Sequence, residues 1–140
     1  MADDVALLIA DVYQLAGEFR RSGEHIAAAE GQTQARWQLL SVLSDGGMTV
    51  PRAARRLGLT RQAVQRVAND LVKDRLVVFE ANLDHRSSPL ATLTPAGRTT
   101  LTAITARARR KNRDIARRIG GPALSRTRDD IRRLLALLQE

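Results

Sequence analysis

Apolar side chains recur at helical spacing along most of this chain. The i, i+3, i+4, i+7 pattern predicts amphipathic helices at about residues 3–22, 33–43, 96–119 and 123–139. Gly23 is expected to interrupt the first helix, while tandem glycines end the second and separate the last two. Long helices at both ends of the chain therefore predict a mainly α-helical fold.

The central stretch, residues 49–94, has a different pattern. Thr49 is expected to cap a short helix that ends at Gly58, and Thr60 to cap a second helix over residues 61–75. In the second helix, apolar residues form one stripe and long polar side chains occupy the opposite side. Two helices joined by a turn that contains glycine predict a helix-turn-helix.

Two strand-like runs follow directly, at residues 76–81 and 90–94, with a polar and basic loop between them. This order predicts a β-wing next to the helix-turn-helix. The predicted fold class is therefore mainly α with a small β-wing, in which N- and C-terminal dimerisation helices flank a winged helix-turn-helix.

The domain organisation follows from these elements. The winged DNA-binding region should comprise residues 33–94, and residues 1–32 and 95–140 should form a helical dimerisation region, all within one intertwined module. The leucine-rich faces of the flanking helices are too large for the winged region to cover. We expect them to pack on each other and on a second copy of the chain, as a homodimer.

Composition and charge narrow the class of partner. The chain has 23 lysines and arginines against 15 acidic residues, a formal net charge of +8, which favours a polyanionic partner. Aromatic residues make up only 3%, so the core must be aliphatic. There is no cysteine, no run of eighteen apolar residues and no secretory signal, so we expect a cytoplasmic protein that does not associate with a membrane.

The second motif helix carries the side chains that suit the reading of a DNA groove. Thr60, Arg61, Gln62, Gln65 and Arg66 lie near its N-terminus. Arginine can donate two hydrogen bonds to guanine, glutamine can bond the edge of adenine, and a helix N-terminus attracts phosphate. A solvated polar face is the alternative, but the turn before this helix and the wing after it favour DNA contact.

The wing loop supplies a second set of candidates. Arg86 is expected to enter the minor groove, with Asp84 holding its guanidinium in place. Arg52, Thr60, His85 and Ser87 are further candidates for phosphate contacts. The expected partner is double-stranded DNA.

A basic run occupies the long helix after the wing, from Arg107 to Arg118. It could contact the DNA backbone, or it could be a solvated face that forms ion pairs with the acidic first helix of another subunit, which we favour. Surface ion pairs of that kind add little stability each.

No catalytic constellation is present in the sequence. His25 and His85 are the only histidines and lie in unrelated contexts, and no nucleophile, metal or phosphate-loop motif occurs. We expect no enzymatic activity, no metal and no cofactor.

Together these features resemble the MarR (multiple antibiotic resistance regulator) family of winged-helix transcription factors. The resemblance covers nearly the whole chain, and its most specific parts are residues 53–59, 60–64 and 93–97, with Asp84 and Arg86 in the wing. The resemblance implies a homodimer that binds a pseudo-palindromic operator, usually as a repressor. Two departures are Arg75, where the family usually has glycine, and the aromatic Phe79, where it favours a basic residue.

The resemblance also implies that a small aromatic or phenolic effector can bind between the dimer helices and the winged region. Tyr13, His25, Arg36 and Trp37 are the candidate pocket residues, although we favour Tyr13 and Trp37 as ordinary core or interface anchors. Two alternatives to a specific regulator stay open: an architectural protein that binds DNA without sequence preference, and a winged-helix module that binds another protein.

Overall fold

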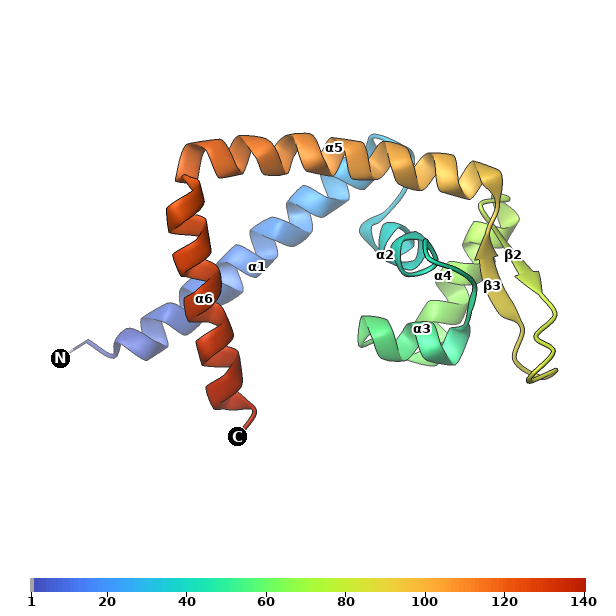
Figure 1. Cartoon of the computed structure of the whole chain (residues 1–140), viewed down its shortest axis with the longest axis horizontal. Coiled ribbons are helices and arrows are strands. Elements are labelled where there is room, and N and C mark those ends of the chain that lie inside the picture. Colours follow the sequence, from blue (N-terminus) through green and yellow to red (C-terminus); the bar gives the residue numbers. More distant parts are fainter. Residues whose placement is uncertain (1) are drawn as a thin grey trace. The chain divides into compact units, whose positions relative to one another are not determined.

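The computed structural model describes residues 2–140. In chain order its elements are α1 (Asp4–Ala28), α2 (Gln34–Val42), β1 (Met48–Thr49), α3 (Val50–Leu57), α4 (Arg61–Lys73), β2 (Val77–Glu80), β3 (Leu90–Leu93), α5 (Pro95–Ile119) and α6 (Gly121–Leu138) (Figure 1). The chain divides into two compact units, Met1–Thr105 and Ala106–Glu140, and the division falls inside α5. The predicted fold class, mainly helical with a small β-wing, is confirmed.

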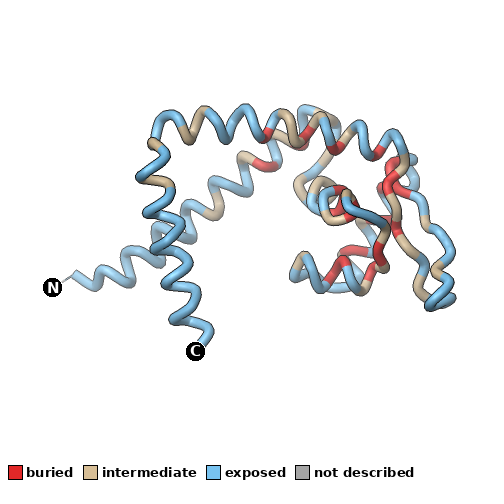
Figure 2. Tube along the Cα trace, viewed as in Figure 1, coloured by how far each residue is buried: buried red, intermediate tan, exposed pale blue. Residues whose placement is uncertain are grey.

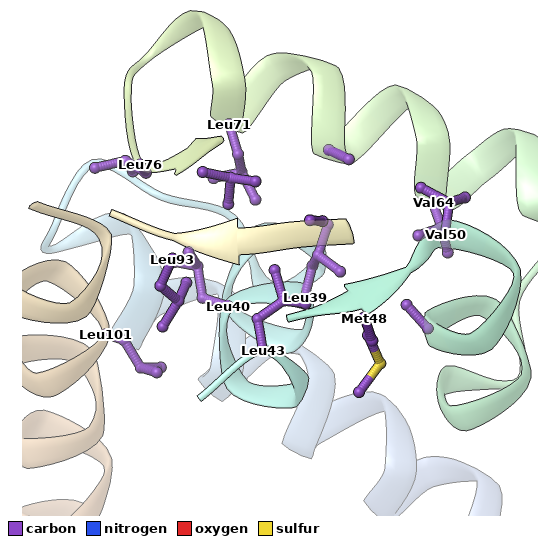
Figure 3. Packing of buried hydrophobic residues seen from close by; sticks show 14 of the residues in the cluster. Leu39, Leu40, Leu43, Met48, Val50, Val64, Leu71, Leu76, Leu93 and Leu101 are labelled. Atoms are coloured by element: carbon purple, nitrogen blue, oxygen red, sulfur yellow. The ribbon is translucent and has the colours of Figure 1, made fainter. Parts of the chain in front are cut away.

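The core of the first unit is aliphatic, as the composition predicted. Figure 3 shows Leu39 and Leu40 of α2, and Leu43 directly after it, packed in one cluster with Leu71 of α4 and Leu93 of β3. Leu76, Leu101 and Ile104 belong to the same buried cluster, so the first turns of α5 are part of this core. Trp37 is half-buried against the cluster.

Most of the predicted helix boundaries are confirmed by their caps. The hydroxyl oxygens of Thr49 and Thr60 accept hydrogen bonds from the N–H groups of Arg52 and Ala63, at 3.3 and 3.1 Å. Gly58 ends α3 in the left-handed conformation, with φ of 67°. Each of these short-range signals therefore acts where the sequence placed it.

The expected interruption of the first helix at Gly23 is wrong. α1 continues through Gly23 to Ala28, and Gly23 itself is buried. A Cβ at this position would lie 3.0 Å from Nε2 of Gln34, at the start of α2. The missing side chain thus allows two helices to approach closely, a requirement that helix propensity alone cannot reveal.

The sheet contains a strand that the sequence did not predict. β1 pairs with β3 in antiparallel register, with Met48 opposite Ala91, and β3 pairs with β2, with Val77 opposite Leu93. The strand order is β1-β3-β2. A strand of two residues is too short to show alternation, so periodicity could not have found it.

The end of α4 explains the first departure from the MarR pattern. Arg75 has φ of 63°, and it is the only residue other than glycine with positive φ within residues 2–140. The N–H of Leu76 donates to the carbonyl of Leu71, and the N–H of Arg75 donates to that of Val72, at 2.9 and 3.0 Å. These two bonds form a Schellman motif, in which an arginine occupies the position that favours glycine.

The two terminal helices leave much apolar surface uncovered. Figure 2 shows α6 and the first half of α1 as almost entirely exposed. The exposed side chains of α1 include Val5, Leu8, Ile9, Val12, Leu15 and Phe19, and those of α6 include Ile131, Leu134, Leu135 and Leu138. Within residues 2–140, none of the helices has the length and apolar character that crossing a membrane requires.

Candidate nucleic-acid interface

The exposed side of α4 carries the predicted groove-reading residues. Val64, Ala68 and Leu71 bury one side of this helix in the core. The burial of that stripe fixes the rotation of α4 about its axis. As a result, four long polar side chains face solvent together: Arg61, Gln62, Gln65 and Arg66.

A neighbouring residue on α4 orients Gln65. Nε2 of Gln65 donates a hydrogen bond to Oδ1 of Asn69, one helical turn later, at 2.9 Å. The second hydrogen on that amide nitrogen and the carbonyl oxygen of Gln65 stay available, and this is the pair that adenine requires. Asn69 was not among the predicted DNA contacts, although its i, i+4 spacing from Gln65 on the polar side of the helix could have identified it.

The wing loop between β2 and β3 is organised by Asn82. Its Nδ2 donates to the carbonyl of Ser88 at 3.1 Å, and its Oδ1 accepts from the N–H of Asp84 at 3.2 Å. The carbonyl of Asn82 also accepts from the N–H of His85. One asparagine therefore closes the loop on both sides and presents His85, Arg86 and Ser87 to solvent.

The expected contact between Asp84 and Arg86 is not formed. Within the described part of the chain no ion pair joins these two side chains, and both are exposed. In water, such a pair gains little Coulomb energy and must immobilise two flexible side chains. The hydrogen bonds that Asn82 forms with the loop backbone, rather than an ion pair, hold the wing in shape.

A groove connects α4 with the wing. Its volume is about 600 Å³, and its lining comprises Val50, Pro51, Arg61, Gln62, Gln65, Asn69, Phe79, Ser87, Ser88 and Pro89. Three of the predicted reading residues of α4 and the predicted Ser87 of the wing therefore share one concave surface. The aromatic ring at Phe79, the second departure from the MarR pattern, also lines it.

The remaining predicted DNA contacts surround this groove without lining it. Arg52 is exposed on α3, Arg66 on α4, and His85 and Arg86 on the wing. Thr60 is exposed at the N-cap of α4, where its hydroxyl oxygen is already engaged with the N–H of Ala63.

The four candidate effector residues lie elsewhere and do not line the groove. Tyr13 is 75% exposed on α1, and His25 is exposed near the end of that helix. Arg36 forms an ion pair with Asp74, the residue that ends α4, and its side chain is only 17% exposed. Nε of Arg36 is buried without a hydrogen-bond partner. The structure thus assigns Arg36 a link between α2 and α4 that the sequence did not show.

The two motif helices, the three-stranded sheet and the wing define a winged helix-turn-helix protein. A sequence profile described as MarR family matches residues 30–87. The uncharacterised protein Rv2011c of Mycobacterium tuberculosis is 58% identical over 139 residues, covering 99% of this chain and 97% of its own length. A Mycobacterium bovis protein, Mb2034c, matches to the same extent. The chain belongs to the MarR family, a family of transcription regulators.

Solved structures agree with this fold. The MarR family transcription regulator SP03579 superposes with a TM-score of 0.88 at 23% identity, covering 98% of this chain and 93% of its own. Staphylococcus aureus MarR in complex with salicylate and kanamycin superposes with a TM-score of 0.84 at 13% identity, covering 96% and 92%. The regulator RdhR-CbdbA1625, which senses organohalides and was solved with 2,4-dichlorophenol, gives 0.81 at 16% identity, covering 96% and 80%.

Proposed function

We propose that this chain forms a homodimer that binds a pseudo-palindromic DNA operator in the cytoplasm and represses transcription. The observation that carries the proposal is the groove between α4 and the wing, which joins the reading side chains of α4 to Ser87 and Ser88 of the wing. The exposed, fixed face of α4 suits insertion into a major groove. The wing, held by Asn82, suits the adjacent minor groove and its phosphates.

The residues divide into three roles in this proposal. Arg61, Gln62, Gln65 and Arg66 read or position on the major groove. Arg86 enters the minor groove from the exposed tip of the wing, where Asp84 lies beside it in the loop. The phosphate contacts come from Arg52, Thr60, His85 and Ser87.

Dimerisation follows from the uncovered apolar side chains of α1 and α6. Monomers in water rarely expose contiguous apolar patches of this kind, so a second copy should cover them. A two-fold dimer would place two α4 helices about 34 Å apart, one turn of DNA. Replacing Leu135 with glutamate should shift the protein toward monomer in sedimentation velocity, and an unchanged dimer would remove α6 from the interface.

A small aromatic or phenolic ligand is the proposed regulator of DNA affinity. Two structural neighbours were solved with salicylate or 2,4-dichlorophenol, which supports a ligand of this chemistry here. Tyr13, His25, Arg36 and Trp37 remain the candidate contacts. Because Arg36 also holds Asp74 at the end of α4, a ligand that engages its guanidinium would act directly on the reading helix.

The experiment that tests the proposal compares the chain's own upstream intergenic duplex with a scrambled duplex, at about 150 mM salt. We expect a preference of about a hundredfold or more, with one dimer per site. Equal affinity for both duplexes would instead indicate an architectural protein without sequence preference. Absence of binding to either would indicate a winged module that binds another protein.

A matched pair of variants assigns the binding to α4. Gln62→Ala should lower operator affinity about fivefold or more, since it removes a proposed base contact. Gln38→Ala makes the same chemical change at an exposed position of α2 and should alter affinity less than about twofold. Equal effects of the two variants would contradict the assignment of the reading surface.

A further inference from the structure

The second half of α5 carries a band of positive charge that the proposed winged interface does not use. Residues 107–118 contain seven basic side chains and one acidic one, a net charge of +6 in a chain whose total is +8. All seven basic residues are exposed. At 100° per residue they spread over an arc of about 200° around the helix, which leaves the side that holds Ala108 and Ile115 without charged residues.

Only part of this charge is neutralised within residues 2–140. Asp114 pairs with Arg117 at 2.5 Å and with Arg118 at 3.3 Å. Within residues 2–140, no carboxylate pairs with Arg109, Arg110, Lys111 or Arg113. Like charges at i, i+3 and i, i+4 destabilise a helix, so this arrangement carries a cost that a bound polyanion would relieve.

The acidic residues of α1 in a second copy are the competing partner. Asp3 already accepts a hydrogen bond from the N–H of Ala6 as the cap of α1, and Glu18 pairs with Arg21 at 2.6 Å. Among Asp3, Asp4, Asp11 and Glu18, at the start and along α1, Asp4 and Asp11 have no hydrogen-bond or ion-pair partner within the described chain. Glu18 is already paired, and Asp3 is engaged at the positive N-terminal end of α1, so α1 offers fewer unengaged carboxylates than the band has unpaired cations. This difference favours a partner other than α1 of a second copy.

We propose that this band, residues 107–118, binds the phosphate backbone of duplex DNA without regard to sequence. Its length along the helix is about 18 Å at 1.5 Å per residue. Over that distance one DNA strand presents about five phosphates, spaced about 3.4 Å apart along the axis. Arginine suits this role because its planar guanidinium bonds phosphate with two parallel hydrogen bonds. The surface acts in addition to the winged interface and does not depend on base reading.

The test uses the full chain and a random-sequence duplex, with affinity measured across a range of salt concentrations. The variant Arg109→Gln/Arg110→Gln/Lys111→Gln/Arg113→Gln removes the four unpaired cations. The control, Arg126→Gln/Arg128→Gln/Arg132→Gln/Arg133→Gln, removes four exposed arginines from α6 in the same unit. Both variants lower the net charge equally, so only the position of the charge differs.

We expect the α5 variant to bind random duplex about tenfold or more weakly at 0.1 M salt, with a log–log salt slope shallower by about 2 to 4. The α6 control should change affinity less than about twofold. Arg109→Lys/Arg110→Lys/Arg113→Lys keeps the charge and should retain most of the binding, which separates loss of charge from loss of folding.

Three results would overturn the proposal. Equal losses in the two glutamine variants would show a general effect of net charge. Unchanged DNA binding in the α5 variant would show a solvated face. Unchanged DNA binding with weakened dimerisation would assign the band to the interface between copies. Because the probe is a random duplex, failure here leaves the operator preference of the winged unit untouched, and the two proposals fail separately.

Discussion

Replacing Arg75 with glycine should stabilise the protein, although it removes a charged side chain next to the reading helix. Arg75 adopts φ of 63°, and the left-handed conformation costs an L-residue about 1–2 kcal/mol. Glycine avoids that cost but loses about 0.5–1 kcal/mol because its unfolded chain is more flexible. The difference predicts a gain of about 0.5–1 kcal/mol in the free energy of unfolding.

The contacts at this position are all made by the backbone and survive the substitution. The N–H of Arg75 donates to Val72, and its carbonyl accepts from Oγ1 of Thr94 at 2.7 Å. The side chain is exposed and forms no ion pair with the described carboxylates. Nothing on the folded side therefore opposes the gain.

Urea unfolding at one fixed protomer concentration measures the effect, because dimerisation makes apparent stability depend on concentration. Lys73→Gly places the same residue two positions earlier, inside the right-handed last turn of α4, and should destabilise by about 1 kcal/mol. Arg75→Ala keeps the backbone constraint without the guanidinium and should lie within about 0.5 kcal/mol of wild type. A loss of stability in Arg75→Gly would refute the reasoning, and a matching loss in Arg75→Ala would trace it to the side chain.

Three further predictions follow from named contacts. Gly97→Ala should destabilise the protein by about 3 kcal/mol or more, because its Cβ would lie 2.0 Å from the carbonyl oxygen of Leu76. The control Gly121→Ala has open space around its Cβ and should be neutral or stabilising. Urea unfolding midpoints of both variants measure the difference, and equal effects would contradict the prediction. Asn69→Ala should reduce discrimination at one operator base pair by about 1 kcal/mol and leave the affinity for random duplex unchanged. Competition with single-base operator variants measures this discrimination. An equal loss of affinity for all duplexes would mean that Asn69 contacts phosphate instead. Arg86→Ala should weaken operator binding by about 1–3 kcal/mol in a fluorescence anisotropy titration, and unchanged affinity would remove the wing from the mechanism.

The features that the sequence predicted well are those with local causes. Thr49, Thr60 and Gly58 act within one helical turn of themselves, so their caps could be assigned from neighbouring residues alone. The buried stripe of α4 follows from periodicity in the same way. The MarR pattern marked Arg75 as a departure, because the family usually has glycine there, and the structure shows that this residue takes the positive φ.

The features that the sequence missed depend on residues distant in the chain. Gly23 had the composition of a helix break, but its role is set by Gln34 on another helix. The pairing of β1 depends on β3, about forty residues later. The ion pair of Arg36 with Asp74 spans 38 positions. Periodicity and capping rules carry no information about such pairs, so only the assembled core could show them.

The last turn of α4 is where these distant contacts converge, and this has a consequence for regulation. Asp74 is held by Arg36 of α2, and the carbonyl of Arg75 is held by the hydroxyl of Thr94, which also caps α5 by accepting from the N–H of Gly97. Gly97 in turn allows α5 to touch the backbone of Leu76. These contacts connect the C-terminal end of the reading helix to α2 and to the start of α5, so a displacement of either element would act on that end. The proposed effector would act by binding one arrangement of these contacts more tightly than another. It would thereby shift the population toward that arrangement and change the angle at which α4 meets DNA.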